Sequence, residues 1–164
     1  MVITTAPSKP LQITFRRYRQ SDDNAIFSLH VLVLKADNVY IGGARWDDDL
    51  KNIDQVYLQN GGEFVVAENY GEMVAMGALK RLCKTDAELK RIRVHPLYRR
   101  QGLAQMLLYI LQDRAVELGY RVLRLDTLVQ QIAAQQLYRK NCFVETGRTV
   151  LGGMDAVLFE KRLL

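Results

Sequence analysis

The chain is poor in cysteine and has no long apolar run. Its two cysteines, Cys83 and Cys142, offer neither a metal-binding spacing nor a disulfide framework, and we expect both thiols to be reduced and buried. No apolar stretch approaches the roughly 18 residues of a membrane-spanning helix, and residues 1–10 hold no apolar signal-peptide core. These absences favour a cytoplasmic protein with no membrane partner.

Proline is scarce as well, and two of the three prolines lie in residues 1–10. This polar segment is expected to be a flexible tail. Residues 11–164 are enough for one domain with a core and too few for two. Neither internal repeats nor low-complexity linkers interrupt them, so we expect a single domain over 11–164.

A strong imbalance of charge is also missing. The net charge is +5, with 25% charged and 49% hydrophobic residues, and these fractions are typical of soluble globular proteins. The basic residues are dispersed, and aromatic side chains do not alternate with them as a base-stacking surface requires. We expect no nucleic-acid partner; the alternative, a basic nucleic-acid-binding domain, predicts strongly salt-dependent binding to DNA or RNA.

Apolar periodicity predicts an α/β (α+β) fold. The predicted strands cover residues 11–15, 64–67, 73–82, 87–94 and 122–125, and two more flank Gly152-Gly153. The predicted helices are one that Ser21 caps and that buries Ile26, Leu29, Leu32 and Val33, and others over 47–59, 103–118 and 131–140. The strand–helix–strand unit over 87–126 supplies a parallel crossover. We expect a mixed, mostly antiparallel sheet of about seven strands flanked by about four helices.

Clusters that would bind a metal are not evident. Asp47-Asp48-Asp49 opens the second predicted helix, where carboxylates complement the helix dipole, and the partner ligands of a metal site are missing. His30 and His95 also lack a paired ligand, so neither supports a metal site or a nucleophilic triad. We expect a helix cap at the three aspartates and no metal.

The segment with the clearest chemical meaning follows the predicted strand over 87–94. Its sequence is Arg99-Arg100-Gln101-Gly102-Leu103-Ala104. Backbone N–H groups at a helix start have no intrahelical partner, and the helix dipole favours an anion. A glycine lets a ligand approach the backbone closely, and arginines suit phosphate oxygens. The segment predicts a phosphate-binding turn; the alternative is an ordinary helix start with two solvated arginines.

The same segment fits the pattern Gln/Arg-x-x-Gly-x-Gly/Ala, and its setting extends the match over residues 87–143. This order and spacing resemble the GCN5-related N-acetyltransferase (GNAT) superfamily, whose members use acetyl-CoA. The resemblance implies a GNAT-like fold in which backbone N–H groups from Arg100 to Ala104 hold the pyrophosphate. It also implies that the strand over 87–94 splays from its neighbour, so that backbone groups of Ile92 and Val94 contact the pantetheine arm and the acetyl carbonyl.

Two residues match catalytic positions of the superfamily. Glu88 occupies the position of a general base, which acts directly or through water; the alternatives are an exposed glutamate paired with Lys90 or an arginine, and a water chain to bulk solvent as the base. Tyr138 matches a tyrosine that lies near the CoA sulfur. With a reference pKa of about 10, against about 8.5 for a thiol, its phenol stays protonated and is available to donate to the thiolate as it forms. Tyr138 also fits a core position, and the two roles can coexist.

Some positions depart from the superfamily pattern. Gln131 stands where an asparagine often contacts pantetheine, and its amide has similar chemistry with a longer reach. Cys142 replaces a common glycine, so we expect the left-handed residue at Asn141. The acceptor pocket is expected to take its walls from residues 40–46, the helix over 47–59, residues 68–71 and the turn at Gly152-Gly153.

Together these features predict an acetyl-CoA-dependent N-acetyltransferase that transfers the acetyl group to a primary amine by direct attack in a ternary complex. The expected partner is a small-molecule or peptide amine. A non-catalytic acyl-CoA-binding sensor or interaction module is the alternative, and it predicts CoA binding without turnover. Dimers are common in the superfamily, so a homodimer is possible, although no feature of the sequence decides it.

Overall fold

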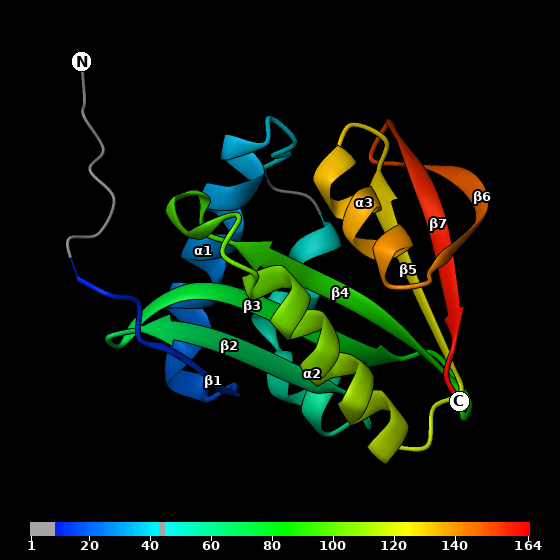
Figure 1. Ribbon diagram of the computed structural model, residues 1–164, viewed down its shortest axis with the longest axis horizontal. Coiled ribbons are helices and arrows are strands. Elements are labelled where there is room, and N and C mark those ends of the chain that lie inside the picture. The colour runs from blue at the N-terminus through cyan, green and yellow to red at the C-terminus, as the bar shows by residue number, and fades with distance from the viewer. Residues whose placement is uncertain (1–8, 43–44) are drawn as a thin grey trace.

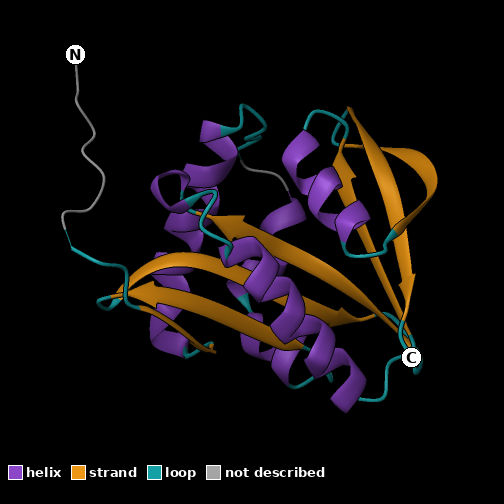
Figure 2. Cartoon of the chain, viewed as in Figure 1, coloured by secondary structure: helices purple, strands orange, loops and turns teal. Residues whose placement is uncertain are grey.

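The computed structural model describes residues 9–42 and 45–164, so most of the predicted tail over 1–10 lies outside the described residues. A twisted sheet runs through the molecule, with helices against both of its faces (Figures 1 and 2). The strands are β1 (Ile13–Arg17), β2 (Glu63–Asn69), β3 (Glu72–Arg81), β4 (Asp86–Val94), β5 (Val122–Leu128), β6 (Val144–Leu151) and β7 (Met154–Arg162). The α-helices are α1 (Asp23–Ala36), α2 (Leu103–Glu117) and α3 (Ile132–Lys140). Short helical turns are η1 (Gln20–Asp22), η2 (Arg45–Lys51), η3 (Asp54–Leu58) and η4 (Pro96–Tyr98).

The described strands form one seven-stranded sheet in the order β1-β2-β3-β4-β5-β7-β6. Neighbouring strands are antiparallel except β4 and β5, which are parallel. The crossover between these two contains α2, because parallel neighbours cannot be joined by a hairpin. The prediction of a mixed, mostly antiparallel sheet is confirmed, together with the position of its parallel pair.

Two apolar clusters hold the layers together. One cluster joins the sheet to α2 and α3, with Leu107, Leu111 and Phe159 at its centre. The other lies on the opposite face and joins the sheet to α1 and η3, with Ile26 and Tyr57 fully buried. None of the helices in the described part of the chain is long and apolar enough to cross a membrane.

Helix α1 differs from its predicted form in its start and in one buried position. It begins at Asp23, after the turn η1, instead of being capped by Ser21. Ile26, Leu29 and Val33 are buried as predicted, but Leu32 is 41% exposed and His30 is fully buried. A buried face with positions i, i+3, i+4 and i+7 includes His30 and leaves Leu32 beyond its edge.

The predicted helix over 47–59 is wrong as a continuous element. The structure divides it into η2, a 3-10 turn, and η3, a single π-helical turn. Leu50, Ile53 and Tyr57 are nevertheless buried as predicted. Side chains of η2 bind to the sheet, as described below.

Both cysteines are free, but the predictions of their burial and of the left-handed residue at Asn141 are wrong. Cys83 and Cys142 are exposed, because Cys83 lies in the β3–β4 turn and Cys142 in the α3–β6 turn. The left-handed residue is Cys142 itself, with φ of 67°, and not Asn141. Asn141 instead ends α3 with its side chain, whose amide nitrogen donates to the carbonyl of Leu137 at 2.8 Å.

The parallel pair β4 and β5 separates soon after it begins. Its register covers only Asp86, Ala87 and Glu88 on β4, and the two strands diverge beyond that point (Figure 1). On its other edge β4 stays paired with β3 up to Val94, through a bulge at which its Arg91 has a φ of 59°. The predicted splay is therefore present, and it opens the sheet between β4 and β5.

Candidate active site

The turn before α2 has the geometry of an anion site. Arg100 and Gly102 have left-handed φ values of 61° and 78°, which reverse the chain so that α2 begins at Leu103. The carbonyl of Gly102 accepts the first helical bond, from the N–H of Met106 at 3.0 Å. The N–H groups of the preceding turn have no intrahelical partner. A Cβ at Gly102 would meet nothing within 4 Å, so the space beside this glycine is open.

A first cleft of about 710 Å³ begins at this turn and runs along the open edge of β4 toward α3. The predicted cofactor residues that line it are Ile92, Val94, Arg99, Arg100, Gly102, Leu103, Ala104, Gln131 and Tyr138. Gln101 is exposed and is not among the lining residues. Arg99 forms an ion pair with Asp37 of the α1 end at 2.9 Å, so this guanidinium is held at the cleft and is not simply solvated.

Gln131 fixes the connection between β5 and α3. Its side-chain oxygen accepts hydrogen bonds from the hydroxyl of Thr127 at 3.0 Å and from the N–H of Leu128 at 3.1 Å. The oxygen is thereby engaged within the protein. The NH₂ end of the carboxamide is the part left to contact a ligand.

A second cleft of about 290 Å³ lies on the α1 side of the opening. Trp46 and Gly152 line it, and both belong to segments predicted as walls of the acceptor pocket. Helix α1 adds His30 and Leu34 to the lining. A Cβ at Gly152 would lie 3.1 Å from the end of Ile41 and 3.4 Å from the Trp46 ring, so the β6–β7 turn and the segment before η2 pack against each other at the rim.

One predicted wall of this cleft is wrong. Residues 68–71 lie at the β1 side of the sheet, where Glu68 forms an ion pair with Arg16 at 2.5 Å. The hydroxyl of Tyr70 donates to the carbonyl of Pro10 at 3.0 Å. These contacts hold the β2–β3 hairpin against β1 and its N-terminal extension, and none of residues 68–71 lines the second cleft.

The two clefts adjoin one another. Both are lined by Ile92, Arg93, Gln131, Ala134 and Tyr138. These residues come from β4 and from the start and middle of α3, which lie on either side of the opening in the sheet (Figure 1). A ligand in the first cleft and a ligand in the second would therefore meet at this shared waist.

Glu88 borders the second cleft at the last position where β4 pairs with β5. Burial raises the pKa of its carboxyl, and the nearby Asp126 adds to the rise, while the charge of Lys90 opposes it. The Lys90 ammonium lies 3.6 Å from the Glu88 carboxylate. The pairing of Glu88 with Lys90, which was the alternative to a catalytic role, is therefore present. The pKa of Glu88 is nevertheless above its ordinary value.

Tyr138 lies at the waist and is also part of the core. Its ring packs edge-to-face on Phe143, with centroids 5.8 Å apart, and against Phe159 at 6.0 Å. Burial raises its pKa to about 12, although the positive charge of Arg93 lowers it in part. The core role and the position at the cleft coexist, and the phenol keeps its proton at neutral pH.

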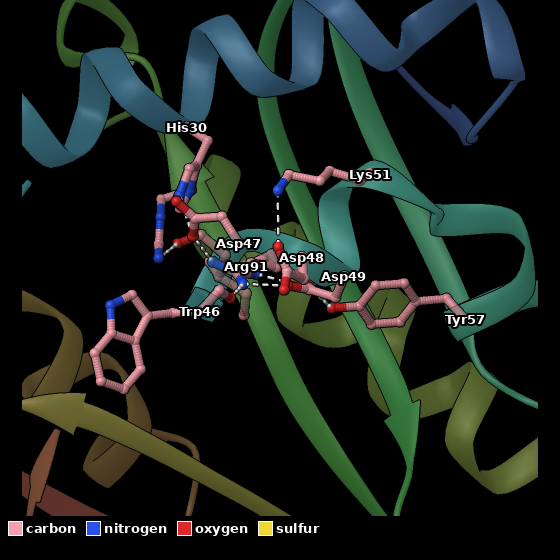
Figure 3. Close-up of polar contacts among 10 residues, drawn as sticks. His30, Trp46, Asp47, Asp48, Asp49, Lys51, Tyr57 and Arg91 are labelled. Atoms are coloured by element: carbon pink, nitrogen blue, oxygen red, sulfur yellow. Dashed lines mark hydrogen bonds and ion pairs between the residues drawn. The ribbon is translucent and has the colours of Figure 1, made fainter. Parts of the chain in front are cut away.

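An ion cluster that the sequence analysis missed joins Arg91 of β4 to η2 (Figure 3). The Arg91 guanidinium contacts the carboxylate of Asp49 at 2.5 Å and that of Asp47 at 3.2 Å. Nε2 of His30 lies 2.9 Å from Asp47, and the hydroxyl of Tyr57 donates to Asp49. Burial alone would raise the pKa of Asp49, but the bonds and charge of Arg91 hold it below its ordinary value.

This cluster corrects the prediction that the three aspartates cap a helix. Asp47 and Asp49 bind an arginine 44 and 42 residues further along the chain, while Asp48 pairs with Lys51 at 2.8 Å near the surface. No spacing rule in the sequence signals a pairing over that distance. The contact brings η2 against the bulge of β4.

We predict that Arg91→Gln lowers the free energy of unfolding by about 3–5 kcal/mol, because it leaves two largely buried carboxylates without their cation. Arg124→Gln is the matched control: Arg124 pairs with Asp86 and Glu160 but is 48% exposed, and such pairs contribute about 1 kcal/mol or less. Urea unfolding of both variants measures the difference. Equal losses of unfolding free energy in the two variants would contradict the role of Arg91 in holding η2 against β4.

Solved structures share this fold. An acetyltransferase of the GNAT family from Staphylococcus aureus superposes with a TM-score of 0.84 at 26% sequence identity, over 93% of this chain and all of that one (100%). An acetyltransferase from Salmonella typhimurium, described as putative and solved with acetyl-CoA, superposes with a TM-score of 0.75 at 20% identity, over 92% of this chain and 93% of that one.

Relatives are also found by sequence. The chain is 32% identical over 95 residues to YjgM, an uncharacterised N-acetyltransferase of Escherichia coli, and 34% identical over 107 residues to human N-acetyltransferase 8. These matches cover 56% and 62% of this chain, and 57% and 47% of the two relatives, so the chain spans about half the length of each. The model of the acetyltransferase (GNAT) family matches residues 5–142, and the chain belongs to that family.

Proposed function

We propose that the protein is an acetyl-CoA-dependent N-acetyltransferase that moves the acetyl group to a primary amine by direct attack in a ternary complex. The observation that carries this proposal is the pair of adjoining clefts, which share Arg93 and Tyr138 at the opening between β4 and β5. Direct transfer needs donor and acceptor bound together with their reacting atoms close. Two clefts that meet at one waist supply that arrangement.

The first cleft fits acetyl-CoA. The N–H groups from Arg100 to Ala104 would hold the pyrophosphate at the positive end of α2, and Lys140 adds positive charge to the lining. The open edge of β4 at Ile92 and Val94, and the NH₂ group of Gln131, would contact the amide-bearing pantetheine arm. The bound group supplies a thioester, whose carbonyl carbon the amine attacks.

Glu88 is the proposed general base. An amine reaches the site as an ammonium ion and must lose a proton before its nitrogen can form a bond. A carboxylate whose pKa is raised by burial accepts that proton more readily, either directly or through a water molecule. Because Glu88 borders the second cleft, it is on the side from which the amine would enter.

Tyr138 is the proposed general acid. As the new N–C bond forms and the C–S bond breaks, the sulfur leaves as a thiolate that needs a proton. The pKa of Tyr138, raised to about 12 by burial, keeps the phenol protonated until the thiolate forms. Because a thiol has an ordinary pKa near 8.5, the transfer is completed when the phenolate regains a proton from solvent. Its place at the waist, next to both clefts, suits this transfer.

We predict that Gly102→Glu abolishes acetyl-CoA binding, because it places bulk and negative charge where the pyrophosphate would lie. Gly71→Glu is the matched control: both glycines have φ near +80° and nothing within 4 Å of an added Cβ, but Gly71 is in the β2–β3 turn. Isothermal titration calorimetry compares the two with the wild type. Equal losses of binding, or no binding by the wild type, would contradict the assigned site.

We also predict an acid limb in the pH profile of kcat/KM, because Glu88 must be ionised to accept a proton. Activity then falls as the pH drops through the raised pKa of Glu88, above the ordinary value of 4.5. Glu88→Gln removes this limb and lowers kcat, by about 100-fold for loss of a general base. Tyr138→Phe lowers kcat, but the fall of kcat/KM at acid pH remains.

Rates with a panel of small primary amines, measured from pH 5 to 9 by release of the CoA thiol, test this assignment. A limb that persists in Glu88→Gln would assign the base elsewhere. Acetyl-CoA binding without turnover of any amine would instead favour the non-catalytic sensor.

A further inference from the structure

The second cleft contains a cation that the proposed chemistry does not use. Arg93 follows Ile92 on β4 and lies opposite Met76 of β3, on the α1 face of the sheet. Its Nη1 donates to the carbonyl of Ile92 at 3.0 Å. Its Nε is buried and has no hydrogen-bond partner among the described residues.

Arg93 differs in this respect from its neighbour Arg91. Arg91 is neutralised by Asp47 and Asp49, whereas Arg93 takes part in none of the ion pairs formed within residues 9–42 and 45–164. A buried charge without a partner is costly. A guanidinium presents its N–H groups as a planar fork that matches a carboxylate. The side chain is therefore suited to a carboxylate that arrives with a ligand.

The same cleft also has negative charge. Glu88 and Asp126 both line it, and each carboxylate favours a positively charged group nearby. His30 lies in the same wall, and burial together with the charge of Arg93 lowers its pKa, so it is neutral at pH 7 and does not repel a cation. Three more charged residues line the cleft: Asp47 and Arg91 pair with each other, and Lys90 lies 3.6 Å from Glu88. Arg93 and Asp126 remain without an ion-pair partner among the described residues, so the cleft provides for one negative and one positive group of a ligand.

Size and polarity restrict the ligand further. The volume of about 290 Å³ accommodates one amino acid. Part of the remaining lining is apolar and includes Ile41, Trp46, Leu128, Leu151 and Met154. A ligand with an apolar side chain would bury it against these residues.

We propose that the acceptor amine is a free α-amino acid with an apolar side chain, whose carboxylate binds Arg93 and whose nitrogen lies toward Glu88. This inference rests on the proposed N-acetyltransferase function. The phosphates of CoA are assigned to the turn before α2, so the anion left for Arg93 is one that the acceptor brings. A peptide N-terminus is disfavoured, because its first carboxyl group is consumed in a peptide bond and carries no charge.

Three ligands of matched shape test this proposal: L-leucine, L-leucinamide and 3-methylbutylamine, which keep the amine and the apolar chain but differ in the carboxylate. Calorimetry with the wild-type protein saturated with CoA measures binding without turnover, and thiol release with acetyl-CoA measures kcat/KM. We expect L-leucine to bind and to be acetylated. We expect the other two to be poorer acceptors by on the order of 100-fold, the loss typical of an unpaired buried charge.

Variants of Arg93 test whether this residue causes the preference for a ligand with a carboxylate. Arg93→Gln is expected to lower kcat/KM for L-leucine by on the order of 100-fold and to reduce the preference over 3-methylbutylamine to a few-fold. Arg93→Lys keeps the charge and restores part of the preference. Acetyl-CoA affinity is measured in the same variants, because Arg93 also lines the first cleft. Arg148→Gln, at an exposed position on β6 outside both clefts, is the control and changes neither quantity.

The outcomes separate the two proposals. Absence of acetyl-CoA binding refutes the N-acetyltransferase function and this inference with it. Acetyl-CoA binding together with equal use of leucine and 3-methylbutylamine, or no binding of any amino acid with an apolar side chain in the presence of CoA, overturns the inference alone. An equal loss for all three amines in Arg93→Gln also overturns it, since that would show a general effect on the site.

Discussion

The early separation of β4 from β5 is the constraint on which the rest of the site depends. The two strands are paired only over Asp86, Ala87 and Glu88, although both continue for several more residues. Beyond Glu88 the edge of β4 that faces β5 lacks a neighbouring strand, and buried backbone polar groups require some partner. Both clefts border this opening. Under the proposed function, the amide groups of the pantetheine arm of acetyl-CoA would bind to this edge of β4 as a neighbouring strand would.

The bulge in β4 decides which side chains face which cleft. In regular alternation Ile92 would follow Glu88 and Lys90 onto the α1 face, but two residues of β4 lie opposite Gly77 of β3, so the order reverses. Ile92 packs with the α2 cluster and Arg93 turns to the α1 face. The bulge needs a left-handed Arg91, which costs about 1–2 kcal/mol in a non-glycine residue. The ion cluster of Arg91 with η2 stabilises that conformation and holds η2 at the rim of the second cleft.

The sequence predicted the parts of the structure that depend on local patterns. The succession of strands and helices along the chain, the crossover through α2 and the turn at Gly102 follow from apolar periodicity and glycine positions. Tyr138 was expected both in the core and at the site. The missed features depend on contacts between distant segments. In the sequence Asp47 and Asp49 have the pattern of a helix cap, and only the fold shows that they bind Arg91. Arg93 likewise has the pattern of an ordinary strand arginine, and only the bulge places its side chain on the α1 face. The turn at 68–71 was misplaced because periodicity does not show which turns of the sheet border the second cleft.

A crystal structure of the protein with bound CoA tests the central claim most directly, namely that the donor lies in the first cleft and ends at the waist. The account predicts pyrophosphate oxygens within hydrogen-bond distance of N–H groups between Arg100 and Ala104, pantetheine along the open edge of β4, and the sulfur next to the hydroxyl of Tyr138. CoA bound away from the β4–β5 opening, or a sulfur out of reach of Tyr138, would contradict it.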